Sequence, residues 1–263
     1  MIFVTGDIHG EVEWNKLNAI KDGPMKGCGK NDYLIVCGDF GLVWYNNQKN
    51  RTYEKQLKWL EKCPFTVLFV DGNHENHELL NSFPVEEWNG GKIHRIGKAI
   101  HLMRGQVFTI EGKKFFTMGG AASHDIWDGI LEPEEDQKIK EWWAEGKAFR
   151  INHLTWWKEE MPSAEEYAEA WKNLEANNFE VDYIITHCAN NIELAMMGFA
   201  EGDELTTFLT KVCNNVKYQH HYFGHYHRDS FLASHGLPAT CIYNRCEMIS
   251  GKPAAKDYEE IWT

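Results

Sequence analysis

Short apolar runs along the chain end repeatedly at a polar turn. Four of them, "IFVT", "LIVC", "VLFV" and "YIIT", contain no charged residue. Uninterrupted apolar runs of this length between turn residues are typical of strands that are buried on both faces. The segments 11–20 and 51–62, which separate the first three runs, are predicted as helices. Strands that alternate with helices predict β-α-β units, an α/β fold and a largely parallel sheet.

The pattern changes in the middle of the chain. Residues 92–120 divide into four short strand-like runs separated by glycine-containing turns, which is typical of antiparallel hairpins. The region of about 126–178 is rich in Glu, Lys, Ala and Trp and is predicted as a helical insertion. Its tryptophans either pin helices to the core or form a lid over a site. We expect one domain over residues 1–250 and a C-terminal tail over 251–263.

The composition limits which binding partners and which cellular compartment we expect. The 263 residues carry a formal net charge of −12, which disfavours an extended nucleic-acid groove, although a local metal site can still bind a phosphate. The seven cysteines form no C-x-x-C pair, as expected of reduced thiols in the cytoplasm. No run approaches the ~18 apolar residues of a membrane helix, and the first ten residues do not resemble a signal peptide. These features predict a cytoplasmic protein with no membrane partner.

Five strand ends carry side chains that can bind metal ions. The set comprises Asp7, His9, Asp39, Asn73, His74, His187, His225 and His227. In an open α/β sheet, ligands bind at the carboxyl ends of the strands, so these loops should converge. Oxygen and imidazole donors without thiolate suit Mn, Fe or Zn. Two such ions about 3.5–4 Å apart, bridged by a carboxylate, can clamp a phosphoryl group and activate a water molecule.

Each cluster alone has a simpler explanation. A D-x-H pair is common, and Asn73 after a glycine is the pattern of a turn, because Asn tolerates left-handed backbone geometry. His77 is predicted as a surface residue at a helix start, and His124 and Asp125 either reach a substrate or form a plain turn. The recurrence of such clusters at five strand ends favours a metal site over these explanations.

The motifs resemble those of a known family, the calcineurin-like metallophosphoesterases. The resemblance runs through "GDIHG", "GDFG", "GNHE", "THC" and "GHYH" in the family's order and spans residues 6–227. It is closest to small bacterial and phage members, in which a "GGA-x-S" turn like Gly119–Ser123 follows the hairpins. The resemblance implies a four-layer β-sandwich of two mixed sheets flanked by helices. This expectation replaces the largely parallel sheet.

The resemblance also implies a role for each candidate residue. Asp39 would bridge two divalent transition metal ions (Mn, Fe or Zn, with Mn favoured), and His74 would be the catalytic acid that protonates the leaving oxygen. The first ion would be held by Asp7, His9, Asp39 and His227. The second ion would be held by Asp39, Asn73, His187 and His225.

Several functions fit these motifs. The first is a binuclear phosphoesterase that hydrolyses phosphomonoesters or phosphodiesters by a metal-activated water. The alternatives are a metal-dependent nuclease of the same superfamily and a non-catalytic scaffold, against which the presence of His74 and of all seven ligand positions counts. The arginines of the family's protein phosphatases are absent, since "GDFGLVW" lacks one and Asp71 replaces the other. A protein-phosphatase role is therefore disfavoured, and the expected partner is a phosphate ester of unspecified identity.

Overall fold

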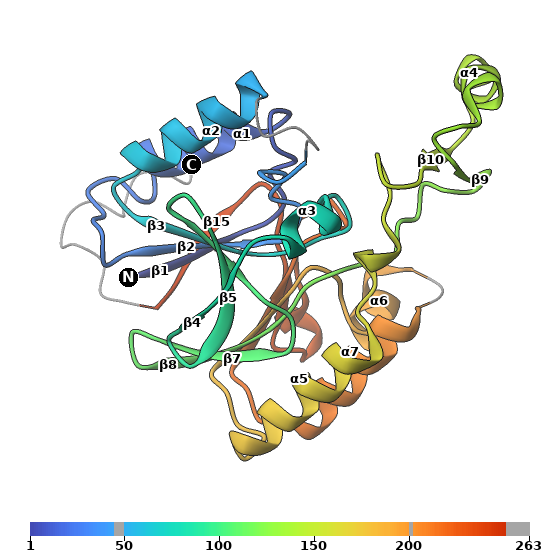
Figure 1. The fold of residues 1–263 in the computed structure, drawn as a ribbon. Helices are drawn as coiled ribbons and strands as arrows, with labels where there is room; N and C mark the ends of the chain where they lie inside the picture. Colours follow the sequence, from blue (N-terminus) through green and yellow to red (C-terminus); the bar gives the residue numbers. More distant parts are fainter. Residues whose placement is uncertain (45–49, 200–201, 251–263) are drawn as a thin grey trace.

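The computed structural model describes residues 1–44, 50–199 and 202–250 and contains two large mixed β-sheets that face each other (Figure 1). The first sheet has seven strands in the order β15 (Cys246–Ser250), β1 (Ile2–Thr5), β2 (Tyr33–Cys37), β3 (Thr66–Val70), β6 (Ala99–Leu102), β5 (Gly91–Ile96) and β4 (Val85–Trp88). The second has six strands in the order β13 (Ser230–Phe231), β14 (Ala239–Cys241), β12 (His220–Phe223), β11 (Tyr183–Thr186), β8 (Lys113–Met118) and β7 (Gln106–Ile110). The fold class implied by the resemblance is confirmed.

Helices cover the outer faces of both sheets. Helices α1 (Trp14–Asp22) and α2 (Arg51–Lys62) lie on the first sheet, whereas α5 (Ala164–Ala176) and α7 (Glu204–Asn215) lie on the second (Figure 1). Three shorter elements complete this body: α3 (His77–Asn81), α6 (Asn191–Met197) and a 3₁₀ turn at Leu232–His235. The order helix, sheet, sheet, helix gives four layers.

Three apolar clusters separate these layers and explain the uninterrupted apolar runs. In β1, Phe3 packs toward Leu17 of α1, while its neighbour Val4 packs toward Phe115 of the second sheet. Successive residues of a strand point to opposite faces, so a strand between a helix layer and a sheet is apolar on both faces and carries no charged residue. In the second sheet, Ile184 of β11 packs toward the helices in the same way.

The topology brings the predicted loops to one edge. Strands β1, β2 and β3 pair in parallel, and β8, β11 and β12 pair in parallel in the second sheet. Both sets of carboxyl ends point to the same edge of the sandwich. The predicted hairpins are present, since β5 pairs with β6 and β7 with β8 in antiparallel fashion. They belong to different sheets, however, because β6 continues the first sheet and β7 the second.

The region that was predicted as a helical insertion has two distinct parts. Strands β9 (Gly129–Leu131) and β10 (Phe149–Ile151) pair in parallel and carry α4 (Asp136–Ala144) on an arm that projects from the body (Figure 1). A 3₁₀ turn at Lys158–Glu160 follows, and α5 then packs on the second sheet through Ala170 and Leu174. The domain boundaries stay predictions, and the expected tail over 251–263 lies outside the described residues.

The arm is joined to the body by a buried arginine at the crossing between the sheets. Arg104 donates to Asp71 Oδ2 from Nε (2.8 Å) and Nη2 (2.6 Å), and Nη2 also donates to the carbonyl oxygen of Glu159 (2.8 Å). Burial opposes the charge of Asp71, but Arg104 and His101 hold the pKa of this carboxyl far below its usual range. His77 lies beside this network and is buried, so its predicted surface position is wrong. No helix among the described residues is long and apolar enough to cross a membrane.

Candidate metal centre

The seven predicted ligand residues lie together at the carboxyl edge of the sandwich. The structure contains three overlapping groups, and within each of them the potential ligand atoms lie within 4.8 Å of one another: Asp7, His9 and His227; His9, Asp39 and His74; and Asp7, Asp39 and His187. Asn73 joins them through its Oδ1 atom, 3.2 Å from His187 Nε2. The rings of His187 and His225 are 5.0 Å apart. Loops that are far apart in the sequence therefore converge on one centre.

The backbone of these loops is strained at the candidate ligands. His9, Asp39, His225 and His227 have φ values of 49°, 46°, 69° and 47°, in the left-handed region that non-glycine residues rarely adopt. Such conformations cost about 1–3 kcal/mol each and cluster at functional sites. Asn73 has no such φ, so the turn explanation for this residue is not supported.

Two motif glycines make room for carboxylates from other loops. A Cβ atom on Gly72 would lie 2.1 Å from Asp39 Oδ1, and one on Gly224 would lie 2.1 Å from Asp7 Oδ1. Glu75 then ties two of the loops together, because it accepts hydrogen bonds from the backbone N–H groups of Gly41 (2.9 Å) and Gly72 (2.6 Å). The glycines before Asn73 and His225 are thus packing requirements of the centre.

Asp39 occupies the middle of the cluster. Its Oδ2 atom lies 3.4 Å from His9 Nε2 and 3.3 Å from His187 Nε2, while Asp7 Oδ2 lies 3.2 Å from His227 Nε2. Two ligand atoms about 2.1 Å from a common ion are roughly 3.0–3.4 Å apart at octahedral or tetrahedral angles. The observed separations match those of atoms that share an ion.

A buried oxygen in the cluster also calls for a cation. Asp7 is fully buried, and its Oδ2 atom accepts no hydrogen bond from any residue that the structure describes. A buried carboxylate oxygen without a donor is costly, and a bound divalent ion would compensate it. The donor set, two carboxylates, one amide and four imidazoles, fits the divalent metals expected from the sequence.

Asp39 controls the protonation of two neighbouring histidines. Burial lowers the pKa of His187, but the charge of Asp39 outweighs it and raises the value to about 10. Burial likewise opposes the charge of His9, whereas hydrogen bonds to Asp39 and Glu13 raise its pKa to about 9. His225 differs, since burial and the charge of His187 hold its pKa well below the usual range. Both His9 and His187 are therefore protonated at pH 7 in the metal-free protein.

Metal binding should therefore release protons. Imidazole must be neutral to coordinate, so a metal held by His9 and His187 at pH 7 would displace a proton from each, and affinity should rise with pH up to about 9–10. The metal-free protein should show the opposite trend in stability. Its histidine–Asp39 pairs contribute fully below pH about 6.5 and are lost as the pH rises through about 9–10. Titration of Mn²⁺ into weakly buffered protein measures the protons released. If no protons are released at pH 7 when Mn²⁺ binds, His9 and His187 are not both ligands.

Neighbouring groups orient the candidate ligands. His187 Nδ1 lies 2.8 Å from the carbonyl oxygen of Cys37, which can only accept, so Nδ1 carries the proton and Nε2 faces the centre. Asn73 Nδ2 donates to Ser123 Oγ (3.2 Å), which donates to Glu160 Oε2 (2.6 Å). This chain turns the amide oxygen of Asn73 toward the centre. Sequence reasoning gave Ser123 only as part of a family-like turn and missed Glu160.

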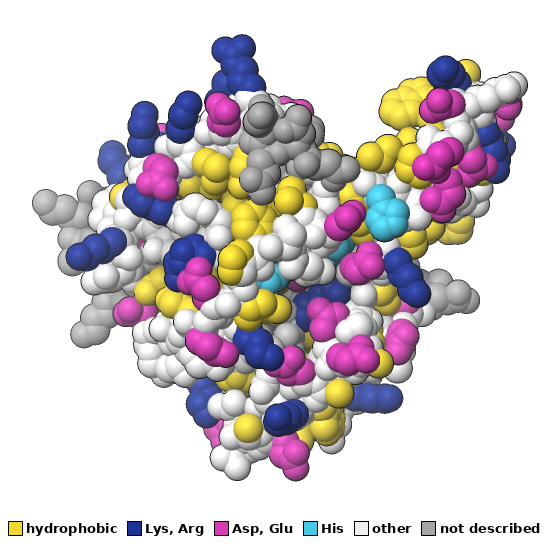
Figure 2. All heavy atoms as spheres, in the orientation of Figure 1, with side chains coloured by type: hydrophobic (Ala, Val, Ile, Leu, Met, Phe, Trp, Pro, Cys, Tyr) yellow, Lys and Arg dark blue, Asp and Glu magenta, His cyan; other side chains and the backbone are white. Residues whose placement is uncertain are grey.

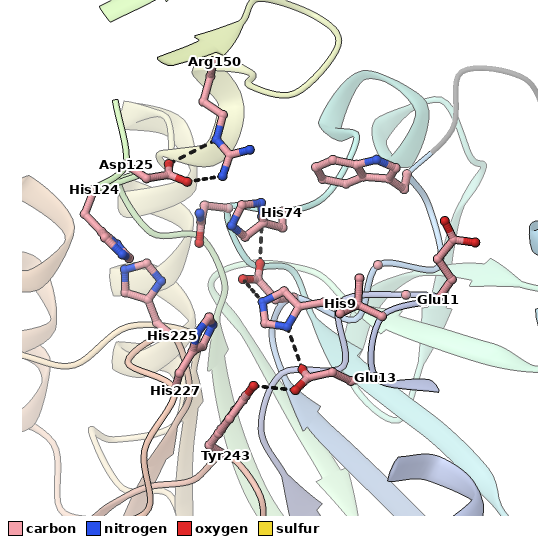
Figure 3. A pocket seen from close by; sticks show the side chains of 16 residues that line it. His9, Glu11, Glu13, His74, His124, Asp125, Arg150, His225, His227 and Tyr243 are labelled. Atoms are coloured by element: carbon pink, nitrogen blue, oxygen red, sulfur yellow. Dashed lines mark hydrogen bonds and ion pairs between the residues drawn. The ribbon is translucent and has the colours of Figure 1, made fainter. Parts of the chain in front are cut away.

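A cavity of about 530 Å³ opens over the cluster (Figure 3). His74 lines it, with its backbone N–H donating to Asp39 Oδ1 (2.7 Å). Trp44 and Tyr243 form parts of the wall. His124 and Asp125 also line the cavity, which favours a position in reach of a substrate over a plain turn. They follow β8, whose carboxyl end lies at the same edge.

The tryptophans of the region 126–178 differ in burial, and only the core-anchoring role has support among the described residues. Trp157 is fully buried, and its ring lies 6.0 Å from that of Trp44, so it joins the arm to the cavity wall. Trp127 and Trp143 are 87% and 75% exposed. In the space-filling view the arm stands clear of the body and carries hydrophobic side chains on its surface (Figure 2).

A family model described as calcineurin-like phosphoesterase matches residues 1–229. The chain belongs to this family, which confirms the resemblance seen in the motifs and defines the class of enzyme, a hydrolase of phosphoric esters that uses divalent metal ions.

Curated relatives with weaker similarity are lariat debranching enzymes. The protein of Drosophila melanogaster is 30% identical over 110 residues, which cover 37% of this chain and 20% of the relative. That of Homo sapiens is 27% identical over 111 residues, with the same shares. That of Danio rerio is 26% identical over 147 residues, 50% of this chain and 24% of the relative. The match spans a fifth to a quarter of these relatives' length.

Proposed function

We propose that this chain is a binuclear metal-dependent phosphoesterase that hydrolyses phosphomonoesters or phosphodiesters. The observation that carries the proposal is the position of Asp39. Its Oδ2 atom lies 3.4 Å from His9 and 3.3 Å from His187, one residue from each of the two expected ligand sets. A carboxylate shared in this way can bridge the two ions of a two-metal centre.

The remaining ligands divide between two ions in the proposal. Asp7, His9 and His227 complete the first set with Asp39, and Asn73, His187 and His225 complete the second. Bound there, the ions would stabilise negative charge on the phosphoryl oxygens and lower the pKa of the attacking water. Mn is favoured over Fe or Zn, because oxygen donors suit it alongside imidazole and thiolate is absent.

His74 is the proposed general acid. Its ring lines the cavity, and neither ring nitrogen forms a hydrogen bond with another residue in the described parts of the chain. Burial lowers the pKa of His74. The charge of Asp39 partly offsets this effect, whereas the charge of Arg150 lowers the pKa further. A side chain held in this position can deliver a proton to the leaving oxygen of a bound ester.

A metal-dependent nuclease is the second candidate function. The similarity to lariat debranching enzymes favours it, whereas the net charge of −12 disfavours an extended groove for nucleic acid. A scaffold role is less well supported, because every expected ligand lies in the cluster. The compartment we propose is the cytoplasm, on the ground that all seven cysteines are free.

A comparison of two esters tests the proposed reaction. With added Mn²⁺, the protein should hydrolyse p-nitrophenyl phosphate, its bis ester or both, and chelation should abolish turnover. A short single-stranded oligonucleotide in the same series separates the nuclease from a phosphoesterase of small substrates. If the protein binds Mn²⁺, Fe²⁺ or Zn²⁺ yet hydrolyses none of the three compounds, the proposed function is wrong.

A further inference from the structure

Arg150 is the only lysine or arginine among the sixteen described residues that line the cavity. It belongs to β10 and therefore reaches the cavity from the arm, not from the motif-bearing loops. Figure 3 shows its guanidinium above His74, across the cavity from His227 and Tyr243. Sequence reasoning missed this residue, because only the path of the arm brings position 150 to the centre.

Asp125 holds the guanidinium in place. Arg150 Nε donates to Asp125 Oδ1 (3.1 Å), and Nη2 donates to Oδ2 of the same carboxylate. The Nη1 atom donates to no residue that the structure describes, so one edge of the planar group is bound and the other is available. Asp125 follows β8 and Arg150 lies on the returning strand, so the ion pair closes the base of the arm over the cavity.

The residues that line the cavity carry more negative than positive fixed charges, and this makes the free edge of Arg150 a candidate anion-binding group. Four carboxylates line it, from Glu11, Glu13, Asp39 and Asp125, and Arg150 is their one fixed positive counterpart. Bound metal ions would neutralise the side of the cavity that contains Asp39. On the side of the arm, Arg150 is the one lysine or arginine in the described lining that an incoming phosphate can meet.

From this arrangement we infer that Arg150 binds the phosphate group of the substrate and that the arm positions Arg150 at the cavity. The inference rests on the proposed function and extends it to substrate recognition. A guanidinium forms two parallel hydrogen bonds to phosphate oxygens, which gives both affinity and orientation. With Nε and one proton of Nη2 engaged by Asp125, the protons of Nη1 and the second proton of Nη2 point to the ligand. Asp125 is a positioning residue in this arrangement.

The competing explanation is that the ion pair only fastens the two strands of the arm. Inhibition by inorganic phosphate distinguishes the two explanations, because it reports anion binding at the site without a chemical step. In the Mn²⁺-loaded full chain, Arg150→Met should weaken competitive inhibition by phosphate roughly ten- to hundredfold, the usual worth of a hydrogen bond between charged groups. KM for p-nitrophenyl phosphate should rise similarly, with metal content unchanged and a smaller change in kcat.

Three further variants make the test specific. Lys147→Met removes a positive charge from the same arm outside the cavity, where Lys147 pairs with Asp128 (3.5 Å), and should leave phosphate inhibition unchanged. Arg150→Lys keeps the charge without the planar group and should give an intermediate loss. Asp125→Asn should weaken phosphate inhibition because the guanidinium is no longer held. The lysine variant decides the matter if Arg150→Met does not fold.

The outcomes separate this inference from the proposed function. Unchanged phosphate inhibition in Arg150→Met and Arg150→Lys, even with a lower melting temperature, would show that the pair only fastens the arm. An inactive wild-type protein would overturn the proposed function instead. Calorimetry with phosphate on the metal-loaded chain would then still report whether Arg150 binds the anion.

Discussion

Replacing Asp39 with asparagine should remove both metal ions and activity together. Asp39 is the one residue expected in both ligand sets, and its Oδ2 atom lies within 3.4 Å of His9 and 3.3 Å of His187. Metal charge stabilises a phosphoryl transition state by several kcal/mol. Because about 1.36 kcal/mol corresponds to a tenfold change in rate, activity should fall roughly 10³-fold or more. Elemental analysis and turnover of one preparation measure both effects.

A matched control separates loss of metal from loss of fold. Asp182 also accepts a backbone N–H, that of Lys114 (2.8 Å), but lies at the start of β11, away from the site. Asp182→Asn should retain both ions and most of the activity. A chain with Asn at position 39 that keeps two ions and near-normal turnover would exclude Asp39 as the bridging ligand.

The second large effect concerns His74 and should leave the metals in place. With Asn at this position, turnover should slow by roughly 10²–10⁴-fold, the usual contribution of a positioned proton donor. The loss should be smaller for p-nitrophenyl phosphate, whose leaving group needs little protonation, than for an aliphatic phosphate ester. Rates on one activated and one unactivated ester, together with metal analysis, give the comparison.

His187→Asn is the contrast for this variant, because His187 is an expected ligand and its loss should reduce metal content. His74 lies close enough to His9 and Asp39 to share an ion, so the distinction needs the experiment. If the His74 variant is purified without metal, or if both esters slow equally with chemistry rate-limiting, His74 is not the general acid.

The strands and the cluster could be predicted because burial determines both. Strands such as β1 lie between two apolar layers, so their sequence carries no charged position, and the polar turn that follows is conspicuous. Strand β4 has the opposite character. Its sequence "VEEW" is exposed over Val85–Glu87, and only pairing with β5 makes it a strand. Strand β15 pairs with β1, although nearly the whole sequence separates the two strands, and no local sequence pattern indicates this contact.

The supporting residues of the site could not be predicted for a related reason. Ser123, Glu160 and Arg150 reach the centre only because β8 runs parallel to β11 and the arm returns to the cavity. Their spacing in the sequence depends on the length of the arm and carries no motif. His77 shows the same limit, since its burial follows from the packing around Asp71 and not from its place at a helix start.

The attachment of the arm through Arg104 limits where insertions and deletions can be tolerated. Arg104 binds Asp71 and the backbone of Glu159, while the carboxylate of Glu160 holds the Ser123–Asn73 pair. An insertion or deletion at this root would shift a candidate metal ligand. The turn around Gly146, beyond α4, touches none of these groups, and a Cβ there would meet nothing within 4 Å. The outer end of the arm is therefore free to be lengthened or exchanged while the centre keeps its geometry.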